Sequence, residues 1–276
     1  MLDDYLKANL ASWDEVTSVH VASELYDVDG FKAGGNSLSS IELAELGPLV
    51  GEGTSLLHLQ CHFGLDTLSW ARQGATATGM DFSGEAIAQA RSLAEELGLS
   101  QRATFLQSDL YHLPDVLEDE FDVVFTSWGA LIWLADLERW AQIIARYLKP
   151  GGIFYIAEFH PNAFLLADDS TPESLRIGYP YFQYGVPQRF DESGDYADPD
   201  ARTQNTVTFE WNHGLGEVID PLLRNGLRLD FLHEFPYTIA GLPFPFLEVG
   251  EDGLQRVKGR DDEVALSFSL KMTKEG

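Results

Sequence analysis

The stretch from Thr54 to Asp81 carries residues whose types and spacing could bind a nucleoside. A short apolar run leads into a compact turn, residues 60–64, which ends at Gly64. Asp81 closes a second apolar run, where an acid can accept hydrogen bonds from ribose hydroxyls. In open α/β sheets such ligands bind at the carboxyl ends of the strands, over the amino end of a helix. The spacing therefore predicts a nucleotide-type site formed by the turn and Asp81.

The elements that must position these residues follow from the hydrophobic pattern around them. Residues 56–59 predict a strand, and apolar side chains then recur at helical spacing from Leu65 to Arg72, before Gly74. Residues 75–80 predict a second strand. Strand, turn, helix and strand together form one βαβ unit, with its ligand end at the turn.

This unit resembles the nucleotide-binding start of the class I S-adenosylmethionine-dependent methyltransferases. The first motif of that family is commonly an acid followed by a turn with three glycines, and the matching residues here are His58-Leu-Gln-Cys-His-Phe-Gly64. Only Gly64 keeps its glycine, and His58 stands where the acid usually does. A side chain at positive φ costs roughly 1 kcal/mol more than glycine. Gln60 and His62 therefore either have negative φ, or they have positive φ and the turn tolerates strain.

The most specific part of the resemblance lies downstream of this unit. Residues 121–127 form an almost continuous apolar run, as expected for a buried parallel strand. A helix is predicted over 136–148, Lys149-Pro-Gly-Gly152 ends it, and a fifth strand follows at 153–158. This order is similar to the second half of the methyltransferase core.

The resemblance also implies which residues hold the cofactor. In that family an acid after the third strand, here Asp109 after residues 103–107, accepts from the adenine amino group, and the amide of Leu110 serves the ring nitrogen. The alternative is that Asp109 only begins a turn or caps a helix. The complete predicted cofactor set is Leu59, Gln60, Cys61, Gly64, Asp81, Phe82, Asp109, Leu110, Ser127 and Trp128.

Methyl transfer from a sulfonium needs alignment, exclusion of water and, for some acceptors, removal of a proton. Glu158, His160 and His213 are the predicted catalytic bases because they lie at the ligand end of the predicted sheet, and His62 is a further candidate from the turn. Each has a structural alternative: His160 precedes Pro161 and could only fix a loop, and His213 could only begin a helix. The sequence has no HExxH or CxxC motif, so no metal is predicted.

The charge of the chain bears on its partners. Its 276 residues include 18 Lys and Arg against 44 Asp and Glu, a net charge of −26. Such a field repels phosphate backbones, so a small-molecule methyl acceptor is predicted and nucleic acid is not. The single cysteine, Cys61, excludes an intrachain disulfide and is expected to be a small buried residue rather than a reactive thiol. No membrane span or signal peptide is recognised, so a cytoplasmic location is predicted; a homodimer is left open.

The fold class predicted from these elements is α/β, with a Rossmann-like, doubly wound sheet. The resemblance adds a sixth strand at 226–234, after a helix at 215–224, and a seventh, antiparallel strand at 264–273, which gives a mostly parallel seven-stranded sheet. Four parts are predicted: an amino-terminal lid or helical segment (1–46), a cofactor-binding core (47–158), an inserted substrate cap (159–211) and the rest of the core (212–276).

The two parts outside the core are expected to lie over the ligand. Residues 206–211 predict a strand within the aromatic-rich cap, paired with residues 180–188. In the amino-terminal segment, Ser40 is a candidate cap for a short helix, and His20 and Tyr26 are the polar contacts expected of a lid.

Three activities are consistent with these features. The first is methyl transfer from S-adenosylmethionine to a small molecule, at oxygen or nitrogen, with sulfur and carbon as the other acceptor atoms. The second is another reaction, such as a cyclisation or elimination, in a retained cofactor pocket, and it is prompted by the altered first turn. The third is a noncatalytic partner protein that has lost the cofactor site, against which the retained Asp81 and Asp109 argue.

Overall fold

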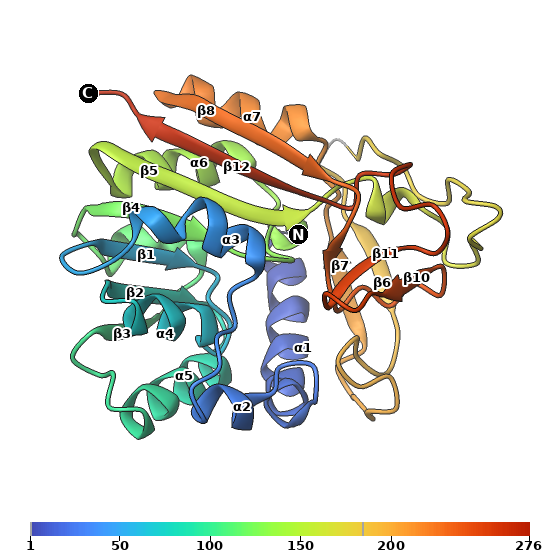
Figure 1. Ribbon diagram of the computed structural model, residues 1–276, viewed down its shortest axis with the longest axis horizontal. Coiled ribbons are helices and arrows are strands. Elements are labelled where there is room, and N and C mark those ends of the chain that lie inside the picture. Colours follow the sequence, from blue (N-terminus) through green and yellow to red (C-terminus); the bar gives the residue numbers. More distant parts are fainter. Residues whose placement is uncertain (1, 184) are drawn as a thin grey trace.

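A seven-stranded sheet forms the centre of the computed structural model, which describes residues 2–183 and 185–276 (Figure 1). The strands lie in the order β3 (Ala103–Gln107), β2 (Thr76–Asp81), β1 (Ser55–Leu59), β4 (Phe121–Thr126), β5 (Leu148–Phe159), β12 (Ser267–Lys274) and β8 (Leu227–Phe235). The pairs from β3 to β5 are parallel, and β12 is antiparallel to both of its neighbours. The predicted Rossmann-like sheet with an antiparallel last strand is confirmed.

Helices cover both faces of this sheet and bury a hydrophobic core on each (Figure 1). One face carries α3 (Ser40–Glu45), α4 (Leu65–Arg72) and α5 (Gly84–Glu96), and the other carries α6 (Leu137–Tyr147) and α7 (Leu215–Arg224). Trp70 is fully buried in the first core and Trp140 in the second. Strand β4 contributes Val123 to one core and Val124 to the other, as expected for a central strand buried on both faces.

The amino-terminal cap of α3 is Ser39, one residue before the predicted cap, Ser40. The Ser39 hydroxyl accepts from the backbone N–H of Glu42 at 3.2 Å, and the Glu42 carboxylate accepts from the N–H of Ser39 at 2.7 Å. This reciprocal pair needs an acid or amide three residues after the cap. Ser40 cannot form it because Leu43 occupies that position.

Within the predicted lid or helical segment, 1–46, lies one long helix, α1 (Leu2–Ala22), whose bounds were not predicted from the sequence. It lies along the edge where the parallel strands end, between the sheet and the insertion (Figure 1), and a short helix, α2 (Val28–Lys32), follows it. Asn9 and His20 are buried in α1, so polar residues occupy positions that a helical pattern expects to be apolar. No helix in the described ranges is long and apolar enough to cross a bilayer.

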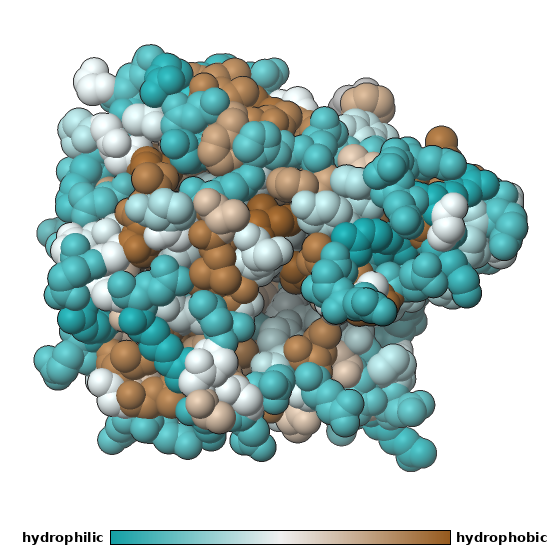
Figure 2. All heavy atoms as spheres, viewed as in Figure 1, coloured by the Kyte–Doolittle hydropathy of each residue, from teal (hydrophilic) through white to brown (hydrophobic). Residues whose placement is uncertain are grey.

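The insertion contains a two-stranded antiparallel sheet of β6 (Gln188–Asp191) and β7 (Val207–Glu210). A strand is therefore present where residues 206–211 predicted one, but its partner begins at Gln188, where the predicted partner, 180–188, ends. A three-stranded sheet of β9 (Thr238–Ile239), β10 (Leu247–Val249) and β11 (Leu254–Val257) lies beside it (Figure 1). The space-filling view shows a recess between these small sheets and the main body (Figure 2).

Candidate functional site

A cavity of about 1050 Å³ lies at the carboxyl ends of β1, β2 and β4. The turn after β1, the residues after β2 and the loop after β4 form its floor, and residues of α1, the insertion and the segment 239–245 form its other walls. Ligand cavities in proteins usually measure about 300–1,000 Å³. This cavity therefore has room for a nucleoside cofactor and a second small molecule.

Most of the residues predicted to bind the cofactor line this cavity. They are Gln60, Cys61, Gly64, Asp81, Phe82, Asp109, Leu110, Ser127 and Trp128. Leu59 does not line it, because its side chain is buried in the core on one face of the sheet. The spacing of the motifs thus identified a set of residues that meet in space, and their contact with a cofactor stays a prediction.

The turn after β1 adopts the strained backbone that its sequence left open. Gln60 has φ 57° and His62 has φ 52°, in the left-handed region that favours glycine. Gln60 donates from Nε2 to the carbonyl of Ala130 at 2.9 Å, which ties the turn to the loop after β4. Gly64, at φ 87°, has no room for a side chain, because a Cβ there would lie 2.7 Å from the ring of Phe105.

His58 occupies the position of the usual acid and joins three elements. Its Nδ1 lies 2.9 Å from the hydroxyl of Thr67 in α4, and its Nε2 lies 3.1 Å from the hydroxyl of Ser127 after β4. Burial lowers the pKa of His58 to about 3, so the ring is neutral. A neutral imidazole therefore joins β1 to α4 and to the segment after β4, where the family usually has a carboxylate.

Asp81 is positioned at the end of β2 by the backbone around it. One carboxylate oxygen accepts from the N–H of His62 at 2.9 Å and the other from the N–H of Ser83 at 3.0 Å. Burial raises the pKa of Asp81 to about 6, although these N–H groups oppose the shift. A carboxylate can accept about four hydrogen bonds, so capacity remains for ligand hydroxyls.

Asp109 is the amino-terminal cap of a short 3₁₀ helix, Leu110–Asp115. Its Oδ1 accepts from the N–H of Tyr111 at 2.7 Å, and its Oδ2 pairs with the ring of His112. The capping alternative is thus observed. Asp109 and Leu110 also line the cavity. Their contact with adenine stays a prediction.

Glu158, predicted as a base, holds the loop after β4 rather than facing the cavity. Its side chain is 2% exposed, and its oxygens accept from the N–H groups of Gly129, Ala130, Leu131 and Phe159 at 2.6–3.0 Å. Burial raises its pKa to about 7, against these four donors. Since the carboxylate is fully used by the backbone, its geometry is that of a positioning residue.

The two predicted histidine bases also support loops. His160 Nδ1 accepts from the N–H of Asn162 at 3.0 Å, and its Nε2 lies 2.9 Å from the Glu234 carboxylate. His213 Nε2 donates to the carbonyl of Leu134 at 2.7 Å. Burial lowers the pKa of both histidines. Neither ring is among the described groups that line the cavity, which corrects the inference drawn from their place in the sequence.

Comparisons with known proteins show what the part of the chain around the cavity is similar to. Residues 57–156 match a family model described as a methyltransferase domain. The crystal structure of an S-adenosylmethionine-dependent methyltransferase from Mesorhizobium loti has a TM-score of 0.56 at 20% identity, covering 88% of this chain and 100% of that one. Residues 57–156 are thus similar to a methyltransferase domain, and the chain has the fold of S-adenosylmethionine-dependent methyltransferases.

The curated relatives match this chain over different lengths. The uncharacterized protein YjhP of Escherichia coli K12 is 40% identical over 108 residues, or 38% of this chain. The chain spans 42% of the length of YjhP, and 33% and 50% of two other relatives. A tRNA 5-carboxymethoxyuridine methyltransferase of Escherichia coli O157:H7 is 24% identical over 70% of this chain and 69% of its own length. Helix α1 and the insertion lie outside the residues that match the family model.

Three residues from separate parts of the chain form a hydrogen-bonded row beside the methyltransferase cavity. His62 Nε2, in the turn, lies 3.0 Å from His20 Nδ1, in α1, and His20 Nε2 lies 2.8 Å from the Asp195 carboxylate, in the insertion. His20 is fully buried. Tyr26 reaches the insertion as well, through a hydrogen bond to the hydroxyl of Tyr196. The predicted lid contacts, His20 and Tyr26, therefore join α1 and the segment after it to the insertion.

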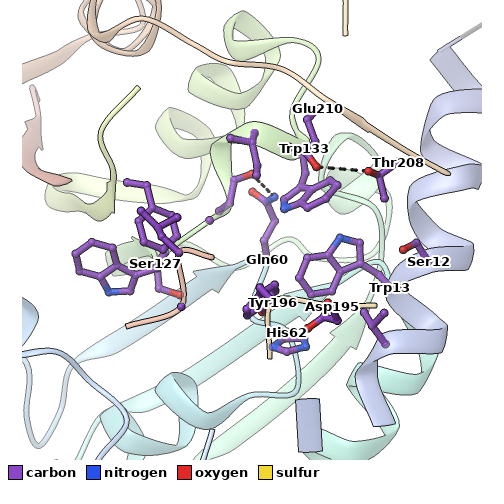
Figure 3. A pocket seen from close by; sticks show the side chains of 18 of the residues that line it. Ser12, Trp13, Gln60, His62, Ser127, Trp133, Asp195, Tyr196, Thr208 and Glu210 are labelled. Atoms are coloured by element: carbon purple, nitrogen blue, oxygen red, sulfur yellow. Dashed lines mark hydrogen bonds between the residues drawn. The ribbon is translucent and has the colours of Figure 1, made fainter. Parts of the chain in front are cut away.

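With a neutral His20 and an ionised Asp195, this row assigns the protons of the ring nitrogens. The carboxylate can only accept, so His20 Nε2 donates to it and His20 Nδ1 accepts from His62 Nε2. His62 Nδ1 is then unprotonated, and within the described chain it has no hydrogen-bond partner. Burial, together with His20, lowers the pKa of His62 well below its usual value. His62 thus presents a neutral acceptor nitrogen from the cavity wall (Figure 3).

Carboxylic side chains occur on several walls of the cavity. Its carboxylic side chains are Asp27, Asp66, Asp81, Asp109, Asp168, Glu192, Asp195 and Glu210. Among the described residues that line the cavity, none is a lysine or an arginine. Sequence reasoning placed only Asp81 and Asp109 at the site. The alternation of polar residues at 206, 208, 210 and 212 is a signal that could have added Glu210, because alternate strand residues share one face.

Proposed function

We propose that this chain transfers the methyl group of S-adenosylmethionine to oxygen or nitrogen of a small-molecule acceptor. The observation that supports the proposal most directly is that the residues after β1, β2, β3 and β4 converge on one cavity with room for a second ligand. Residues 57–156 match a methyltransferase domain, and the proposal assigns methyl transfer to the whole chain.

The residues present fit this cofactor. S-adenosylmethionine carries a positive sulfonium and a positive ammonium, and the cavity is lined by carboxylates. Asp81 would hold the ribose, and Asp109 with the amide of Leu110 would hold adenine. The cofactor supplies a methyl group on an excellent leaving group, so the chain must align and enclose the acceptor and, for some acceptors, remove a proton.

We assign proton removal to His62, the candidate base that lines the cavity. The proton of the acceptor passes to His62 Nδ1, and the Nε2 proton of His62 passes to His20 Nδ1. The positive charge then rests on His20, beside the Asp195 carboxylate. The lowered pKa of His62 disfavours a positive charge on its ring. In this path the charge does not stay on that ring.

The competing activities predict different products. A cyclisation or elimination would consume no methyl group, and a noncatalytic protein would bind no cofactor. An RNA acceptor, as named for the tRNA methyltransferase relative, fits the acidic cavity less well, because phosphates would meet carboxylates without a described Lys or Arg beside them.

Isothermal titration with S-adenosylmethionine and S-adenosylhomocysteine tests the cofactor site. Asp81→Ala is expected to weaken both affinities by roughly 1.5–3 kcal/mol, because charge-assisted bonds to ribose are lost. Glu85→Gln is the matched control, since Glu85 is exposed at the start of the neighbouring helix α5. Absence of binding to the unmodified protein would overturn the proposal in favour of a noncatalytic role. Methylated product in stoichiometric amount with S-adenosylhomocysteine would exclude other chemistry.

A further inference from the structure

We infer that the acceptor is recognised through a positively charged nitrogen, held by the carboxylate of Glu210 beside the indole rings of Trp13 and Trp133. The inference rests on the proposed function, because it names the chemical class of the second ligand in the same cavity. The subsite is built by α1, the loop after β4 and the insertion. Trp13, Trp133 and Glu210 are not among the predicted cofactor contacts.

The alternation of strand β7 points Glu210 into the cavity. Thr208 and Glu210 line the cavity, whereas Phe209 and Trp211 pack against Tyr5 of α1, with ring centroids 4.4 and 6.0 Å from it. Successive side chains of a strand point to opposite faces. The side chain of Glu210 is therefore directed at the ligand space by its strand.

Three separate segments meet around this carboxylate. Helix α1 is joined to β7 by two 2.8 Å hydrogen bonds between the side chain of Asn9 and the backbone of Phe209. The loop after β4 is joined to the end of β7 by a 2.8 Å bond from the N–H of Trp211 to the carbonyl of Ile132. Trp13 and Trp133 close the triangle with ring centroids 5.4 Å apart (Figure 3). The subsite is thus rigidly built on all three sides.

The Glu210 carboxylate has little to balance it. The Thr208 hydroxyl donates to it at 3.4 Å, which is long for a hydrogen bond. No Lys or Arg in the described chain lines the cavity, and Glu192 adds a second carboxylate to the same wall. Burial raises the pKa of Glu210 to about 7, and Glu192 adds to the shift. A partly buried carboxylate without a cation carries a desolvation cost, and a cationic ligand would reduce that cost.

The aromatic rings favour the same ligand. A cation over an indole face gains about 0.5–1 kcal/mol when exposed and about 2 kcal/mol or more when desolvated. Glu210 and Trp133 lie on one side of Gln60, away from His62 at the turn (Figure 3). An anionic acceptor would instead meet carboxylates on every wall. An ammonium group with an apolar body satisfies both the charge and the rings.

The test compares two ligands that differ in charge and little in shape, phenethylamine and 2-phenylethanol. Binding to the complex with S-adenosylhomocysteine is measured by isothermal titration, so no methyl group can be transferred. We expect the amine to bind at least about tenfold more tightly than the alcohol. Glu210→Gln should remove that difference and leave the affinity for S-adenosylhomocysteine unchanged. Asp191→Asn is the matched control, since it removes one charge from the exposed part of the same small sheet.

Proton release gives a second readout that is independent of affinity. Burial raises the pKa of Glu210 to about 7, so binding a cation near that pH should release protons from this site, measured in buffers of different ionisation enthalpy. The Glu210→Gln variant should release none from this site. Equal affinity for amine and alcohol, or an amine preference that survives in Glu210→Gln, would overturn the inference. Titration is repeated without S-adenosylhomocysteine, so an amine site that persists when the cofactor fails to bind would separate the two proposals.

Discussion

The two ends of the cavity are built in different ways. The end proposed to bind the cofactor, here called the cofactor end, is formed by short turns that directly follow β1, β2, β3 and β4, so each residue is placed by the strand before it. The end proposed to bind the acceptor, here called the acceptor end, is formed by α1 and the insertion, whose contacts join residues up to 200 positions apart. The cofactor end is therefore specified by residues close in sequence, and the acceptor end by packing between distant segments.

This difference is visible in how the polar groups are used. At the cofactor end, Asp81 and Glu158 accept mainly backbone N–H groups, which fix loops. At the acceptor end, His20 and Asp195 pair side chain to side chain, and Glu210 has only a long bond to Thr208. A site fixed by backbone tolerates few changes, whereas a site fixed by side chains can change its ligand by substitution.

The largest effect is expected from Gly64→Ala at the cofactor end. The new Cβ would lie 2.7 Å from Phe105 and 2.9 Å from Ala90, at φ 87°. Left-handed strain and overpacking together should lower the free energy of unfolding by about 2–5 kcal/mol, measured by denaturant titration. Gly53→Ala is the control, because Gly53 has φ 86° and open space around it. Equal losses in both variants would show that packing around Gly64 is unimportant.

A smaller loss is expected when Glu158 is replaced by Gln. The amide keeps one acceptor oxygen, so at least one of the backbone donors in the loop after β4 is left unsatisfied, at a cost of about 2–4 kcal/mol in unfolding free energy. The pH dependence is a second readout. Because burial raises the pKa of Glu158 from 4.5 to about 7, the folded state binds the proton more tightly and this group favours folding less as pH rises from 4.5 to 7. Glu158→Gln should flatten that slope; an unchanged slope would assign it to other groups.

The sequence predicts the cofactor end of the cavity better than the acceptor end. Spacing identified Asp81 and the turn at Gly64, because strand ends in a parallel sheet must meet at one edge. The same reasoning misplaced Glu158, His160 and His213, since nearness to that edge does not say whether a side chain faces the cavity or the loops behind it. The acids Asp195 and Glu210 were missed because their positions depend on α1, a helix whose buried Asn9 and His20 hide its periodicity.

Replacing His62 separates the proposed base from the predicted ones. His62→Ala should reduce kcat by on the order of 10²-fold with little change in affinity for S-adenosylhomocysteine, because proton transfer is lost while Asp81 still binds ribose. Asp195→Asn should shift the pH profile of kcat, since it removes the charge that stabilises a protonated His20. His213→Ala, whose ring only contacts the carbonyl of Leu134, is the comparison and should alter stability rather than the pH profile. A wild-type pH profile in Asp195→Asn would contradict the relay.

The smallest effect is expected from loosening the acceptor end alone. Asn9→Ala removes two hydrogen bonds to the backbone of Phe209 and should cost about 1–2 kcal/mol of unfolding free energy. Because this pair orients β7 and so Glu210, KM for an amine acceptor should rise while the dissociation constant of S-adenosylhomocysteine stays the same. Glu15→Gln is the control, since Glu15 tethers the exposed residues Gln204 and Asn205 of the same insertion. If Asn9→Ala weakened both ligands equally, the two ends of the cavity would be one mechanical unit, and the division between them would fail.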